Sequence, residues 1–100
     1  MSQTSASLPP HPGSLLLTTL DHLNCTRAVA ARLLGLSRQT LYEINGEKQA
    51  ITPSVALRVA ELTGTAPEKR LDMQQVHDLA VARVYCRSLL QKVPQLEERW

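Results

Sequence analysis

Large side chains are scarce in this sequence of 100 residues, which contains no phenylalanine, one tryptophan and two tyrosines. Apolar residues still make up 43% of the chain, which is enough for one small hydrophobic core. A core built almost without aromatic side chains gains from dimerisation, because a second copy buries more apolar surface. The length itself predicts a single domain.

Cysteine, charge of one sign and long apolar runs are also scarce. Cys25 and Cys86 form no CxxC pair and have no ligand spacing with histidine, which argues against a disulfide framework and a zinc finger. The net charge of +2 is too small to indicate a nucleic-acid partner by itself. No run approaches the roughly 20 apolar residues of a membrane span, and no signal peptide opens the chain, so we expect a cytoplasmic protein without a membrane partner.

Motifs for catalysis and cofactor binding are absent as well. The chain has no glycine-rich phosphate loop, no Ser/His/Asp order and no HExxH motif. Its three histidines have no cysteine or carboxylate partner at a ligand spacing, apart from the adjacent Asp21 and Asp78; they are His11, His22 and His77. We therefore expect no enzyme activity, no cofactor and no metal site.

What the sequence does contain is the pattern of a small all-α domain. Residues 1–12 are rich in serine, threonine and proline and predict a flexible arm, and residues 94–100 predict a flexible tail. Between them, apolar residues recur at helical spacing, as in the stripe of Leu16, Leu20 and Leu23. With the start and stop signals, this spacing predicts a domain over 13–93 with helices at about 13–23, 27–34, 38–45, 53–63 and 67–93.

Capping residues mark the helix boundaries in the middle of the chain. Thr26, Ser37 and Thr52 are predicted N-caps, since each hydroxyl can accept from a free backbone N–H. Gly35 is predicted to end the second helix in a left-handed conformation. The second and third helices then meet at one tight turn, and the small Ala31 allows them to cross closely. This arrangement predicts a helix-turn-helix, although the same spacing also fits an ordinary helical bundle.

The exposed side chains of the third helix suit base recognition. Arginine can bridge guanine O6 and N7, and glutamine can bridge adenine N6 and N7, so Arg38 and Gln39 are the predicted base-reading residues. Glu43 faces the same way; it would repel phosphate but could accept from a cytosine amino group. Side chains near the helix N-termini and in the following loop are suited to phosphate; they are Thr26, Arg27, Ser37, Lys48 and Gln49.

The last predicted helix carries a heptad-like apolar seam, formed by Leu79, Ala82, Cys86, Leu89 and Val93. The seam can close the core over the helices at 13–23 and 53–63. It can also extend beyond the core to form a dimer or to receive a partner protein. The spacing leaves both interpretations open.

Four segments in order make the chain resemble the HigA-type antitoxins, a branch of the Cro/repressor-like (XRE) helix-turn-helix family. The resemblance implies a five-helix Cro/repressor-like bundle with an extended C-terminal helix. The segments are Pro9-Pro10-His11-Pro12-Gly13; Ala31 to Leu41; Ile51-Thr52-Pro53 with Ala56-Leu57-Arg58; and Gly64, Pro67-Glu68, Leu71, Gln74 and Asp78-Leu79.

The resemblance also implies a function. A HigA-type protein binds double-stranded operator DNA as a homodimer, represses its operon and neutralises a HigB/RelE-like mRNA endonuclease toxin. Base contacts would come from Arg38, Gln39 and Glu43. Phosphate contacts would come from Arg27, Ser37, Thr40 and the loop near Lys48. A stand-alone repressor without a toxin, and an interaction module that has lost DNA binding, are the alternatives.

Two departures from the family pattern fall on the last predicted helix. Lys69-Arg70 stands where an aromatic pair commonly follows Pro-Glu, and His77 stands where a tyrosine is usual. These changes limit what the resemblance implies about packing and partner contacts there.

Overall fold

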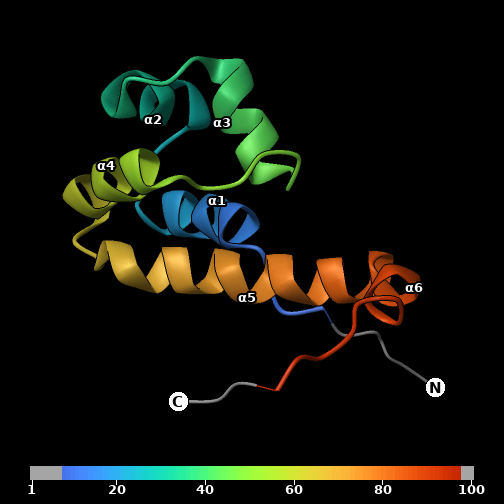
Figure 1. The fold of residues 1–100 in the computed structure, drawn as a ribbon. Helices are drawn as coiled ribbons and strands as arrows, with labels where there is room; N and C mark the ends of the chain where they lie inside the picture. The colour runs from blue at the N-terminus through green and yellow to red at the C-terminus, as the bar shows by residue number, and fades with distance from the viewer. Residues whose placement is uncertain (1–7, 98–100) are drawn as a thin grey trace.

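The computed structural model describes residues 8–97, and every regular element in this range is helical (Figure 1). This confirms the all-α fold class. The six helices are α1 (Pro12–His22), α2 (Arg27–Leu34), α3 (Arg38–Asn45), α4 (Pro53–Thr63), α5 (Pro67–Tyr85) and the short α6 (Arg87–Leu90).

Local side-chain chemistry sets the boundaries of the middle helices, as the sequence predicts. The hydroxyl oxygens of Thr26, Ser37 and Thr52 each accept from the backbone N–H three residues later, at 3.2, 3.0 and 3.3 Å. These contacts satisfy donors that a helix start leaves free. Gly35 follows α2 with φ of 70°, a conformation that glycine adopts without the penalty of a Cβ. The predicted caps are confirmed.

The hydrophobic core is supplied by the first four helices and the loop before α4. α1 lies between α5 on one side and α3 on the other (Figure 1). By contrast, α5 contributes the partly buried Leu71 and two buried polar side chains, Arg70 and Gln74. The buried apolar residues are Leu16, Leu20, Ala30, Ala31, Leu34, Leu41, Ile44, Ile51, Val55, Ala56 and Val59.

The start of α1 is packed directly against the end of α3. A Cβ on Gly13 would collide with the backbone carbonyl of Ile44, so only glycine allows this approach. The side-chain amide of Asn45 donates to the Gly13 carbonyl oxygen at 3.0 Å, and this hydrogen bond is buried. The C-terminal end of α3 is therefore held against α1 by shape and by a hydrogen bond.

A buried glutamine fixes the loop between α3 and α4. Gln74 Oε1 accepts from the backbone N–H of Ile51 at 2.8 Å, and its Nε2 donates to Asp78 Oδ1 at 2.9 Å. The first of these bonds satisfies a backbone donor that the loop would otherwise bury without a partner. Through Gln74, α5 anchors the loop that follows α3.

Two expectations at the start of the chain need correction. Leu23 does not complete the buried stripe: α1 ends at His22, and Leu23 at its C-cap is 51% exposed. The predicted arm of residues 1–12 lies outside the described residues over 1–7, but His11 and Pro12 are buried. His11 is the N-cap of α1, which places these two residues in the folded domain.

The predicted single helix over 67–93 is also wrong. The structure ends α5 at Tyr85, and Cys86 has φ of −98° and ψ of 7°, outside helical geometry. Most apolar side chains beyond Leu79 have no neighbour to pack against: Val84, Leu89 and Val93 are each more than half exposed. A helix without tertiary packing is only marginally stable, so the helical spacing of apolar residues is not enough to continue α5 to residue 93. Residues 94–97 are non-helical, and the remainder of the predicted tail, 98–100, lies outside the described residues.

The N-cap of α1 is a histidine that works only while its ring is neutral. His11 Nδ1 accepts from the backbone N–H of Gly13 at 2.9 Å, which a protonated Nδ1 cannot do. Burial lowers the pKa of His11, and the adjacent His77 lowers it further, against smaller opposite effects of Glu47 and Asp78. The folded chain therefore resists protonation of His11 more than the unfolded chain does.

This lowered pKa predicts a loss of stability in mild acid. Above the ordinary histidine pKa of about 6.5, His11 makes its full contribution to the free energy of unfolding. This contribution decreases as the pH falls from there toward the lowered pKa of His11 in the folded chain. We expect the melting temperature to fall between about pH 7.5 and pH 5.5 and H11N to reduce that fall, because asparagine caps a helix without titrating. H22Q, at an exposed histidine, serves as the control. Equal pH dependence of H11N and wild type would contradict the prediction.

Candidate nucleic-acid interface

The turn between α2 and α3 is rigid before any ligand binds. The backbone N–H of Leu36 donates to the Ala31 carbonyl at 2.9 Å, which closes the turn. From α4, Arg58 Nη1 donates to the carbonyl oxygens of Leu34 and Gly35 at 3.1 and 3.3 Å. Arg58 belongs to one of the four segments that resemble the family, but its spacing predicts no role for its side chain. Its guanidinium fixes the angle at which α3 leaves α2.

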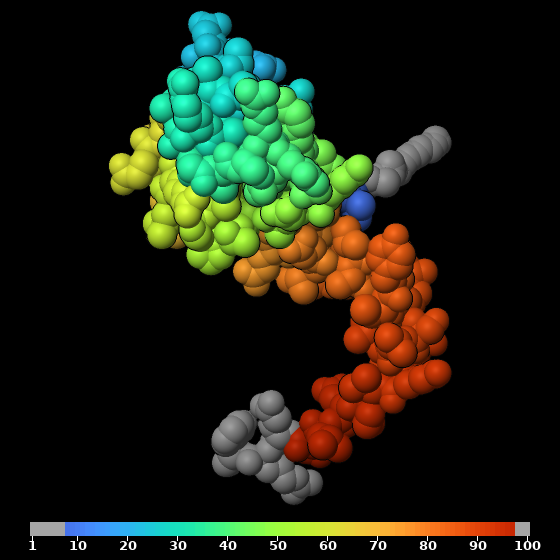
Figure 2. Space-filling view, turned by 90° about the horizontal axis from the view of Figure 1, so that it is seen from above, coloured from blue at the N-terminus to red at the C-terminus, as the bar shows by residue number. Residues whose placement is uncertain are grey.

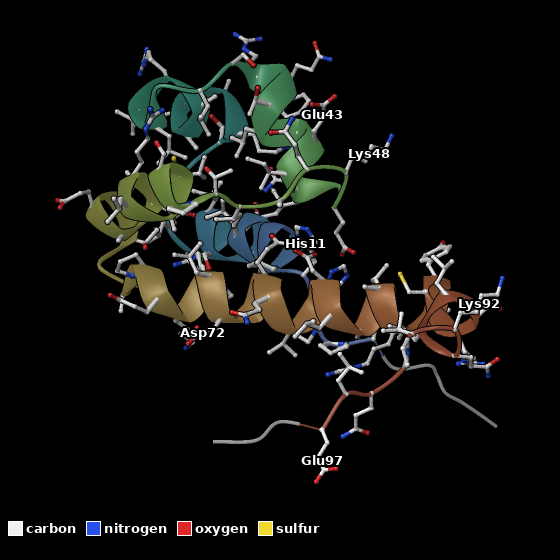
Figure 3. The ribbon with its side chains drawn as sticks, viewed as in Figure 1. His11, Glu43, Lys48, Asp72, Lys92 and Glu97 are labelled. Carbon is white, nitrogen blue, oxygen red and sulfur yellow. The ribbon has the colours of Figure 1, made fainter. Side chains whose placement is uncertain are left out.

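The outer face of α3 brings together the three predicted base-reading residues. Arg38 and Gln39 are exposed, and Glu43 is half-buried. They line an open hollow of about 430 Å³ together with Tyr42, Gly46 and Lys48. Glu43 and Lys48 lie on α3 and on the loop that follows it (Figure 3). Side chains suited to base edges and to phosphate therefore share one surface.

Hydrogen bonds within this surface already hold Glu43. Its carboxylate accepts from Gln39 Nε2 at 3.4 Å and from Gln49 Nε2 at 2.8 Å. Two amide donors thus hold the acidic group that would repel a phosphate in one orientation. The same bonds connect the predicted base-reading Gln39 with the predicted phosphate-binding Gln49.

Arg27 is held beside α3 by an aromatic ring that the sequence analysis did not include in the site. Its guanidinium carbon lies 4.2 Å from the centre of the Tyr42 ring, within the range of a cation–π interaction. Tyr42 is 42% exposed. The stacking leaves the N–H groups at the guanidinium edge free for phosphate while restricting the side chain's motion.

The remaining predicted phosphate ligands are the helix-capping residues. Thr26 and Ser37 are exposed but use their oxygens as N-caps of α2 and α3. Ser37 Oγ also donates to Thr40 Oγ1 at 2.8 Å, so these two hydroxyls are linked at the start of α3. The Ser37 hydroxyl could donate to a phosphate only by replacing this bond, whereas Thr26 and Thr40 act as acceptors in the bonds described and keep their own O–H donors.

The seam residues lie away from this surface and do not close the core. Leu79 is 46% exposed, Leu89 62% and Val93 66%, and Ala82 is exposed while Cys86 is half-buried. Figure 2 shows the end of α5, α6 and the following residues projecting from the body of the molecule. The core-closing interpretation is therefore wrong for the seam from Leu79 onward, whereas the preceding part of α5 does pack on α1 and α4 and places Leu71 against the core. The role of the seam as an interface stays a prediction.

Other kinds of site find no support in residues 8–97. No three side chains of histidine, cysteine, aspartate or glutamate gather there as a metal site would require. Within the same range, no helix has both the length and the apolar character to cross a membrane.

Two curated relatives align with most of the chain, whereas no protein-family model matches it. The uncharacterized HTH-type transcriptional regulator YddM of Escherichia coli strain K12 is 30% identical over 73 residues, covering 73% of this chain and 78% of that protein. Virulence-associated protein A' of Dichelobacter nodosus is 34% identical over 79 residues, covering 78% and 69%. These relatives share the region that contains α2 and α3.

Solved structures with the same fold include antitoxins. An addiction module antidote protein of the HigA family from Coxiella burnetii matches with a TM-score of 0.81 and 27% identity, covering 91% of this chain and all of that one. The Pseudomonas aeruginosa antitoxin HigA, solved with the higBA promoter, matches with a TM-score of 0.79 and 25% identity, covering 87% and 96%. These proteins are antitoxins and transcription regulators, not enzymes. The chain belongs to the HigA-type antitoxins of the helix-turn-helix family.

Proposed function

We propose that this chain binds double-stranded operator DNA as a homodimer, represses its own operon and neutralises a HigB/RelE-like mRNA endonuclease toxin. The fold shared with an antitoxin solved on promoter DNA is the observation that supports this most. In this chain, α3 presents Arg38 and Gln39 on an exposed face fixed by the turn and by Arg58. These are the residue types that read guanine and adenine in the major groove.

Contacts to the DNA backbone would complete the docking. Arg27, stacked on Tyr42, and Lys48, which lines the same hollow as Tyr42, are the cations beside the base-reading side chains of α3. The capped starts of α2 and α3, at Thr26 and Ser37, present backbone N–H groups that favour phosphate oxygens. In this proposal, phosphate contacts orient the helix and the base-reading side chains provide the specificity.

The homodimer would use the projecting C-terminal region. Large exposed apolar areas on a small protein mark interaction surfaces, and this region presents Leu79, Val84, Tyr85, Leu89, Leu90 and Val93. Pairing of two such surfaces would also cover the exposed apolar side chains at the end of α5 and on α6. A two-fold dimer would place two copies of α3 for a palindromic operator.

Co-expression with the product of the neighbouring gene tests the proposal. We expect this chain to relieve the growth arrest that the neighbouring protein causes, to co-purify with it and to shift a duplex from its own promoter. The control is the R38A/Q39A double variant, which should still relieve growth arrest while losing operator selectivity. Operator binding without relief of toxicity would favour the stand-alone repressor, and loss of both activities would contradict the proposal.

A further inference from the structure

Arg70, in the first turn of α5, is a buried cation whose Nη1 is unpaired within the part of the chain that the structure describes. Only 7% of the residue is exposed, and its Nη1 has no hydrogen-bond partner among residues 8–97. Burial lowers the pKa of the Arg70 guanidinium, as expected for a charge removed from water without a carboxylate beside it. Buried charges in proteins are normally paired, yet no carboxylate among residues 8–97 forms an ion pair with this arginine.

The unpaired guanidinium lines a cavity of about 200 Å³ between α1 and the start of α5. Lys69 supplies a second cation, and Thr19 and Thr65 supply hydroxyl groups. The two cations of this cavity, which we call the Arg70 pocket, therefore favour a negative group, whereas the Thr19 hydroxyl already donates to the Leu15 carbonyl at 3.2 Å.

The position of the Arg70 pocket separates it from the other two predicted surfaces. α1 lies between α5 and the helices that carry the DNA-reading face (Figure 1). Along α5, Leu79 begins the predicted dimer surface about 13 Å from Arg70, at roughly 1.5 Å per residue. A partner seated in the pocket would leave α3 and much of the apolar C-terminal region accessible.

We propose that the Arg70 pocket receives an aspartate or glutamate side chain of the toxin. A guanidinium binds a carboxylate through two parallel hydrogen bonds, and the small cavity fits a side chain better than a nucleic-acid backbone. The Arg70 guanidinium would then be paired with a carboxylate only when the toxin is bound. The inference rests on the proposed function, because it names the part of the chain that holds the toxin.

Toxin binding by calorimetry, with melting temperature measured in parallel, tests the inference. R70M keeps the length of the side chain and removes its charge. We expect it to weaken toxin binding about 30-fold or more, since the toxin's carboxylate would then be buried unpaired. The melting temperature of free R70M should stay unchanged or rise, because a buried unpaired charge is removed. K92M, at an exposed lysine near α6 (Figure 3), should leave both quantities unchanged.

The outcomes separate this inference from the proposed function. Toxin binding by R70M at wild-type affinity would overturn the inference alone, and so would a loss of dimerisation instead of toxin binding. Absence of toxin binding by the wild-type chain would overturn both proposals. If R70M does not fold, R70Q, which is polar but uncharged, takes its place, and wild-type affinity of R70Q for the toxin would overturn the inference.

Discussion

Replacement of Gly13 with alanine is expected to lower the melting temperature by about 15 °C, equivalent to about 3 kcal/mol of unfolding free energy. The added methyl group would meet the Ile44 carbonyl in the backbone of α3 and come within 3.0 Å of His11 Nδ1. A backbone atom cannot rotate away as a side chain can, and Asn45 holds the two helices together at this point. The higher helix propensity of alanine offsets at most about 1 kcal/mol.

Thermal unfolding followed by circular dichroism measures this effect, with G46A as the matched control. A Cβ on Gly46 would come within 3.3 Å of the Tyr42 carbonyl, and Gly46 has an ordinary φ of −87°. The control should therefore lower stability much less than G13A. A melting temperature of G13A within about 3 °C of wild type would mean that α1 and α3 separate at little cost.

The parts of the fold that the sequence predicts correctly are those determined by neighbouring residues. A hydroxyl at Thr26, Ser37 or Thr52 caps the N–H three residues along the chain, whatever packs against the helix. Gly35 reverses the chain because of its own backbone freedom. Four local signals are thus enough to place α2, α3 and the start of α4.

The features that the sequence does not predict depend on distant contacts. The spacing of Leu89 and Val93 is helical, but no other element covers them, and the helix ends at Tyr85. Arginine is usually a surface residue, yet Arg70 is buried beside α1. His11 belongs to a proline-rich stretch that looks unstructured, but its ring caps α1 and contacts the ring of His77 from α5. The contacts of Arg70 with α1 and of His11 with His77 join residues far apart in the sequence, which local spacing does not predict.

The candidate site shows the same division. Helical periodicity places Arg38, Gln39 and Glu43 on one face, and the structure brings them together. The stacking of Arg27 on Tyr42 and the bonds from Gln39 and Gln49 to Glu43 depend on side-chain conformations that spacing does not determine. Sequence therefore predicts which residues share the surface but not how they hold one another.

Alanine at Arg38 or Gln39 is expected to reduce discrimination between operator and scrambled DNA by about 1–3 kcal/mol each, or about 5- to 150-fold. Each substitution removes a side chain able to form two hydrogen bonds with one purine. Both residues are exposed, so the fold should be unaffected. Fluorescence anisotropy with the chain's own promoter and a scrambled duplex, at several salt concentrations, measures the effect.

K48A is the matched comparison, because it removes a predicted phosphate contact from the same surface. It should weaken binding to both duplexes alike and reduce the salt dependence by about one counterion. The hydrogen bond from Gln39 to Glu43 should not prevent Gln39 from reading a base. At 3.4 Å this bond is long, so replacing it with hydrogen bonds to an adenine edge costs little free energy. Full discrimination by both R38A and Q39A would show that α3 does not enter the major groove through its first turn.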